Sequence, residues 1–120
     1  MTRLIRSVRF GVAGLSHAIK SEPNLRIHFL ATIVVVATAV WLKIAALEWA
    51  LVAGCVGAVM GFELLNTAIE RMADRVTGET DPLIKQAKDT AAAAVLVVSI
   101  VAAVIGGIIF LPKAWAIWGG

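Results

Sequence analysis

The sequence predicts an all-α integral membrane protein, one domain over residues 1–120 with three transmembrane helices and an N-terminal amphipathic surface helix. Composition is the first indication, because 60% of the 120 residues are hydrophobic, whereas soluble chains are about 45–50% apolar. The second is that uncharged apolar stretches recur along the chain, and the last has the length that a bilayer requires. The third is that basic residues flank these stretches. They form no basic and aromatic patch of the kind that binds nucleic acid.

Residues 3–21 are predicted to form the surface helix. At a helical spacing the apolar side chains fall on one side and the basic ones on the other. The basic side chains on that second side are Arg6, Arg9 and Lys20. Such a helix is suited to an anionic membrane surface. Pro23 should end it, because the residue before a proline disfavours the α conformation.

The three transmembrane helices are predicted at about residues 27–47, 48–72 and 89–112. The last is the clearest, because no charged residue occurs from Thr90 to Pro112. The other two are predicted from their context between charged boundaries. Residues 75–88 are polar, and we expect a surface loop there that leads into the start of the third span.

The distribution of Lys and Arg predicts the orientation. Nine of the eleven basic residues lie in the N-terminal segment or near the 75–88 loop, and the opposite side holds only Lys43 and Lys113. The positive-inside rule then places the N-terminus and this loop in the cytoplasm, and the C-terminal tail outside.

Three polar residues interrupt the second span at Glu63, Asn66 and Glu70. With Asp74 they fall within about 80° of one another on a helix, so they form one polar stripe. An ionised carboxylate in lipid costs roughly 2.5–3.5 kcal/mol at mid-bilayer, so we expect the stripe to face protein or a wet cleft.

Charged residues of the other spans are expected at the same cytoplasmic depth. They are Glu22, Arg26, Lys88 and Asp89. A deep carboxylate can act as a general base, and shallower ones can share a hard cation such as Mg²⁺ with phosphate oxygens. Phosphorylation of a membrane alcohol would use such a site. By spacing alone, Glu70 and Asp74 could instead be interfacial residues paired with Arg71 or Arg75 at the helix end. Lys85 and Asp89 could form a plain surface pair, and His17 and His28 are expected to be isolated and interfacial.

The motif Glu63-Leu-Leu-Asn66-Thr-Ala-Ile-Glu70, followed by Asp74 and Ala87-Lys88-Asp89, resembles the prokaryotic diacylglycerol kinase family. The upstream segment Glu22-Pro-Asn24-Leu-Arg26-Ile-His28 matches as well, so the resemblance covers nearly the whole chain. It implies a homotrimeric enzyme of the bacterial cytoplasmic membrane that uses MgATP to phosphorylate a lipid hydroxyl. The active sites would face the cytoplasm and lie between neighbouring subunits.

The resemblance also implies roles for individual residues. Glu63 would be the general base, and Asn66 would orient the acceptor or the γ-phosphate. Glu22 and Glu70 would hold the Mg²⁺ that bridges the ATP phosphates. The remaining nucleotide-binding positions would be Arg3, Phe10, Glu79, Thr80, Asp81, Lys88 and Asp89.

Two positions depart from the diacylglycerol-specific branch of the family. Phe10 stands where that branch has Tyr, and Ala92 stands where it has Ser. The Arg26-Ile-His28 segment looks closer to the branch with undecaprenol kinases of Gram-positive bacteria. We therefore expect a diacylglycerol kinase, with undecaprenol kinase as the alternative. A small proton-coupled transporter is the alternative from another functional class, because such proteins also use an intramembrane Glu.

Overall fold

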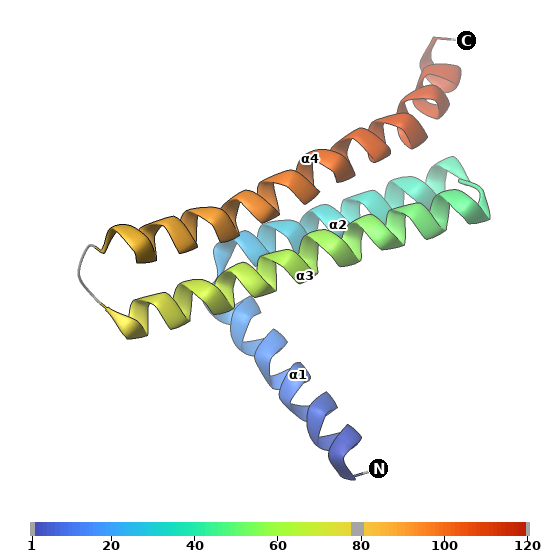
Figure 1. The fold of residues 1–120 in the computed structure, drawn as a ribbon. Helices are drawn as coiled ribbons and strands as arrows, with labels where there is room; N and C mark the ends of the chain where they lie inside the picture. Colours follow the sequence, from blue (N-terminus) through green and yellow to red (C-terminus); the bar gives the residue numbers. More distant parts are fainter. Residues whose placement is uncertain (1, 78–80, 120) are drawn as a thin grey trace.

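The computed structural model describes residues 2–77 and 81–119, which form four α-helices (Figure 1). The helices are α1 (Thr2–Ser21), α2 (Pro23–Leu42), α3 (Ala46–Val76) and α4 (Pro82–Trp118). Figure 1 shows α2 and α3 side by side, α4 running along α3, and α1 projecting away from the other three. The last three helices are long and apolar enough to cross a membrane. The predicted all-helical fold with three candidate spans is therefore confirmed.

Local sequence explains where the helices begin and end. Pro23 occupies the first turn of α2, where its missing N–H would have no intrahelical partner. Lys43, at φ 53° and ψ 55°, closes α2 in the left-handed conformation, and the Lys43 and Ile44 amides donate to the carbonyls of Val40 and Ala39. A short connection therefore joins α2 to α3.

The connection between α3 and α4 is shorter than the loop expected at residues 75–88. Helix α3 continues to Val76, and α4 begins at Pro82. Asp81 is the N-cap of α4, since its carboxylate accepts from the amides of Leu83 and Ile84 at 2.8 and 3.2 Å. This cap and the proline at the first helical position start the helix seven residues before the predicted span. Helix α4 also continues beyond residue 112, with Pro112 inside it.

Few side chains are buried within one chain. Ala39, Ile44, Val52 and Ile109 form a small core between α2, α3 and α4. Most large apolar side chains of these helices are exposed instead, as Leu30, Leu65 and Val104 illustrate. Apolar surface of this extent indicates contact with lipid or with other protein chains.

Two ion pairs join α3 to α4. Lys113 Nζ lies 3.2 Å from Glu48 Oε1 at the start of α3, and Lys88 Nζ lies 2.8 Å from Asp74 Oδ1 near its end. The helices are antiparallel, so the first pair lies at one end of the bundle and the second at the other (Figure 1). The buried apolar core, with Val52 of α3 and Ile109 of α4, lies toward the end that holds Glu48 and Lys113.

Candidate functional site

The polar stripe on α3 is buried at one end and exposed at the other. Glu63 is 4% exposed and Asn66 is 8% exposed, whereas Glu70 is half-buried and Asp74 is exposed. The prediction that the stripe faces protein is therefore confirmed for Glu63 and Asn66. Burial of a carboxylate is costly unless a partner lies nearby, so the surroundings of Glu63 are the first question.

His28 of α2 is that partner. Its Nε2 lies 3.7 Å from Glu63 Oε2, and the two side chains are 27% and 5% exposed. The expectation that His28 is isolated was wrong, because the packing of α2 on α3 brings it against the stripe. The sequence did contain a signal for this contact, because His28 lies at the start of a predicted span, at the same depth as Glu22 and Arg26.

Asn66 and Glu70 are joined within α3. Asn66 Nδ2 donates to Glu70 Oε1 at 3.3 Å, so the amide contacts a carboxylate of its own helix. Asn66 Oδ1 is buried and has no hydrogen-bond partner among the described residues. A buried acceptor without a donor is unusual in folded proteins, and this oxygen is therefore available to a ligand.

Glu22 faces the same region from the start of α2. Its side chain makes no hydrogen bond that caps α2, and its Oε1 lies 3.8 Å from Arg71 Nη2 of α3. Arg71 also donates to Ser21 Oγ. Arg71 therefore holds the end of α1 and the start of α2 near the stripe.

Lys88 and Asp89 both lie on α4, Lys88 at the end of the segment that was expected to be loop and Asp89 at the start of the predicted third span. Lys88 pairs with Asp74 across the helix interface, as described above, and this gives Asp74 a structural partner. Asp89 Oδ2 lies 2.5 Å from Lys85 Nζ, which is the plain surface pair that the spacing allowed. The two neighbours thus have different surroundings, and only Lys88 contacts the stripe.

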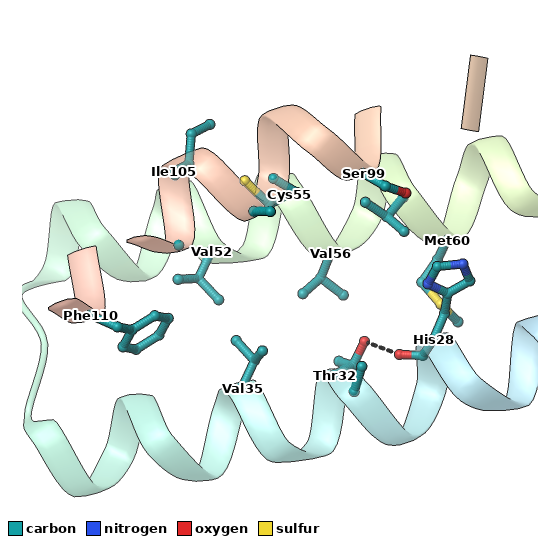
Figure 2. A pocket seen from close by; sticks show the side chains of 15 residues that line it. His28, Thr32, Val35, Val52, Cys55, Val56, Met60, Ser99, Ile105 and Phe110 are labelled. Carbon is teal, nitrogen blue, oxygen red and sulfur yellow. Dashed lines mark hydrogen bonds between the residues drawn. The ribbon is translucent and has the colours of Figure 1, made fainter. Parts of the chain in front are cut away.

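An apolar cavity of about 290 Å³ lies between α2, α3 and α4. Figure 2 shows His28 and Met60 at one end of it and Phe110 at the other, with Val35, Val52 and Val56 between them. The Thr32 hydroxyl at the side of the cavity donates to the His28 carbonyl at 2.8 Å (Figure 2). His28 therefore has the cavity on one side and Glu63 on the other.

Comparison with known proteins identifies the family. The family model described as prokaryotic diacylglycerol kinase matches residues 9–110, which include the whole of α2 and α3 and most of α4. The chain belongs to the prokaryotic diacylglycerol kinase family.

Relatives within this family carry two different names. The chain is 34% identical to an undecaprenol kinase of Bacillus subtilis over 113 residues, 94% of this chain and 92% of the relative. It is 37% identical to a diacylglycerol kinase of Escherichia coli over 103 residues, 86% of this chain and 84% of the relative. It is 40% identical to a diacylglycerol kinase of Synechocystis sp. over 110 residues, 91% of this chain and 63% of the relative.

The remaining site residues expected of this family member are dispersed in the structure. Asp81 caps α4, as described above, and Glu79 and Thr80 lie outside the described residues. Arg3 and Phe10 are exposed on α1, whose N-terminal end lies far from the other helices in Figure 1. A single chain thus brings the α3 stripe, Glu22 and Lys88 together, and leaves the expected contacts of α1 apart from them.

The carboxylates of this diacylglycerol kinase family member fit Mg²⁺ in chemistry and in number. Hard oxygen donors such as Glu22 and Glu70 suit this ion, which commonly takes one or two carboxylates and completes its shell with water and substrate phosphates. Within the described ranges, no group of three or more His, Cys, Asp or Glu side chains could hold a metal ion by itself. Glu22 and Glu70 are thus oxygen donors of the kind that Mg²⁺ takes.

Proposed function

We propose that this protein is a membrane lipid kinase that transfers the γ-phosphate of MgATP to the hydroxyl of a lipid alcohol. The observation that carries the proposal is Glu63, a carboxylate buried in an apolar helix and followed in line by Asn66 and Glu70. Membership of the prokaryotic diacylglycerol kinase family supports it. The family and the named relatives are kinases, and they give no support to a proton-coupled transporter.

Glu63 is proposed to act as the general base. Its carboxylate takes the proton of the acceptor hydroxyl while the hydroxyl oxygen bonds to the γ-phosphorus. The bond from that phosphorus to the bridging oxygen of the β-phosphate breaks, and ADP leaves. The products are a lipid phosphate, ADP and a protonated Glu63, which returns its proton to water.

Asn66 and Glu70 are proposed to organise the phosphate side of the site. Asn66 would orient the acceptor or the γ-phosphate, and its amide already donates to Glu70. Glu22 and Glu70 would hold Mg²⁺, which when bound neutralises negative charge on the ATP phosphates. Lys88 and Asp89 would bind the nucleotide, and Arg3, Phe10 and the 79–81 segment would add further contacts.

Dispersal of the expected nucleotide contacts supports a composite site. The side chains of Arg3 and Phe10 are exposed on α1, so a neighbouring subunit can use them for its own site. We therefore propose a homotrimer in the bacterial cytoplasmic membrane, with α1 lying on the cytoplasmic surface. The largely apolar outer faces of α2, α3 and α4 are compatible with both lipid and subunit contacts.

Diacylglycerol is the proposed acceptor, giving phosphatidic acid. Undecaprenol, giving undecaprenyl phosphate, is the second candidate. The observation that favours it is the match to the Bacillus subtilis undecaprenol kinase, which extends over more than nine-tenths of both chains. Both acceptors present a hydroxyl on an apolar molecule, so the same base serves either reaction.

The test is a phosphotransfer assay with purified protein, radiolabelled ATP and Mg²⁺ in mixed micelles that contain either diacylglycerol or undecaprenol. We expect one acceptor to be labelled, and Glu63→Gln to lower turnover by about 10²–10⁴-fold, the contribution typical of a general base. Glu48→Gln is the matched control, because it makes the same change at the opposite end of α3. Full turnover by Glu63→Gln would refute the base assignment, and absence of labelled lipid with either acceptor would refute the proposed reaction.

A further inference from the structure

Arg71 of α3 lies against the elbow between α1 and α2, next to a carboxylate that the proposed function assigns to the metal. Its Nη2 lies 3.8 Å from Glu22 Oε1, and it also donates to Ser21 Oγ. The Ser21 hydroxyl in turn donates to the His17 carbonyl at 2.9 Å, so its lone pairs remain for the guanidinium. Arg71 is thus held at the end of α1 by a bond that does not involve Glu22.

The backbone of Glu22 is fixed, whereas its carboxylate is held loosely. The Glu22 amide donates to the Ala18 carbonyl at 2.8 Å, and the side chain makes no hydrogen bond that caps α2. Within residues 2–77 and 81–119, Arg71 is the only ion-pair partner of this carboxylate. Their separation is longer than a hydrogen bond, and both side chains are partly exposed. Such a pair adds little stability, so Glu22 can exchange Arg71 for another cation at small cost.

A guanidinium in this position acts differently on a bare metal ion and on a metal–nucleotide complex. Mg²⁺ is a divalent cation, so the positive charge of Arg71 beside the ligand Glu22 opposes its binding. The complex of Mg²⁺ with ATP is negative overall, because the triphosphate carries more charge than the metal neutralises. Arg71 attracts this complex, and the planar fork of its N–H groups suits phosphate oxygens. The same side chain therefore disfavours one form of the metal and favours the other.

We propose that Arg71 makes the metal site selective for the metal–nucleotide complex over the bare divalent cation. Arg71 pairs with Glu22 until the complex arrives. The metal then takes Glu22, and the guanidinium turns to a phosphate oxygen of the nucleotide while Ser21 keeps it at the site. This inference rests on the proposed function, in which Glu22 is a metal ligand, and adds a specificity-determining residue to it.

The test separates the charge of Arg71 from its shape. Arg71→Gln removes the charge and keeps an amide that can donate a hydrogen bond. Arg71→Lys keeps the charge and removes the planar fork. Arg75→Gln is the matched control, because Arg75 is an exposed arginine about one turn further along α3. A general effect of surface charge would appear in both Gln variants, whereas the proposed effect belongs to Arg71.

The first measurement is binding of Mn²⁺ alone, which takes the same oxygen ligands as Mg²⁺, followed by the electron paramagnetic resonance of the free ion in zwitterionic micelles. Arg71→Gln should tighten binding about tenfold at low salt, since a unit charge near a divalent ion has been removed, and the gain should shrink as salt rises. Arg71→Lys and Arg75→Gln should stay within about threefold of the wild type. Glu22→Gln in the Arg71→Gln background should remove the gain. Equal binding by wild type and Arg71→Gln, or no binding by either, overturns the proposal.

The second measurement is binding of Mn²⁺ together with a non-hydrolysable ATP analogue, followed by displacement of a fluorescent nucleotide. Arg71→Gln should weaken this binding about tenfold, as expected for loss of a hydrogen bond from a charged group. The two effects of Arg71→Gln thus have opposite signs, whereas a variant that folds poorly would bind both forms less tightly. A change of the same sign in both measurements, or an equal response of Arg75→Gln, overturns the proposal.

Neither measurement uses an acceptor lipid or phosphate transfer, so the two proposals can fail separately. Opposite shifts in the two affinities without phosphate transfer to a lipid would retain the selectivity of Arg71 and reject the kinase reaction. Phosphate transfer without opposite shifts would retain the kinase reaction and reject the role of Arg71.

Discussion

The pair formed by His28 and Glu63 allows a quantitative test of the buried end of the site. The change is His28→Ala, which leaves the Glu63 carboxylate buried without its partner. When His28 carries a proton on both ring nitrogens, the two unit charges 3.7 Å apart interact by about 4.5 kcal/mol at an effective dielectric constant near 20. Breaking a buried ion pair by removal of one partner typically costs about 3–5 kcal/mol. Because the His28 side chain is 27% exposed, water screens part of the interaction, and we expect a loss of about 2–3 kcal/mol in unfolding free energy.

The assay is unfolding of the purified protein in mixed detergent micelles, followed by helix content. Glu63→Gln in the His28→Ala background should recover most of the lost free energy, because a neutral amide costs much less to bury than a carboxylate without a partner. His17→Ala is the control, since His17 is exposed on α1. A loss below about 0.5 kcal/mol for His28→Ala, or a double variant less stable than His28→Ala, would refute the proposed interaction.

Two further predictions concern α4. Asp81→Ala should lower the unfolding free energy by about 1 kcal/mol, because the amides of Leu83 and Ile84 lose their acceptor. Chemical denaturation would measure this loss. An Asp81→Asn variant as unstable as Asp81→Ala would argue against capping. Lys88→Met should raise the KM for ATP roughly 10-fold or more, as expected for loss of a hydrogen bond from a charged group. Its stability should change little, because water screens the exposed pair with Asp74. Steady-state kinetics beside Lys85→Met would test this, and an equal KM for the two variants would contradict a special role of Lys88.

Periodicity and composition were sufficient for the helices and for the stripe. The spacing of Glu63, Asn66 and Glu70 placed them on one helical face, and the cost of a carboxylate in lipid placed that face against protein. The structure agrees for Glu63 and Asn66, which are both buried. These inferences succeed because they depend on residues of the same helix, whose relative positions the helical repeat determines.

Contacts between helices could not be predicted in the same way. The partner of Glu63 is 35 positions earlier in the chain, and the partner of Lys88 is 14 positions earlier. Such pairs depend on how α2, α3 and α4 rotate and shift against one another, which a single sequence does not specify. The start of α4 was placed too late for a different reason: the polar residues after Pro82 were assigned to a loop, although Asp81 supplies the cap that begins a helix there.

The ion pairs at the two ends of the α3–α4 interface constrain how these helices can move. Glu48 and Asp74 are separated along α3 by almost the same number of residues as Lys88 and Lys113 along α4. Sliding α4 along α3 by one helical turn, about 5.4 Å, would break both pairs at once. Longitudinal slippage is thus opposed at both ends, whereas tilting or bowing of the helices would open the middle of the interface and keep both pairs.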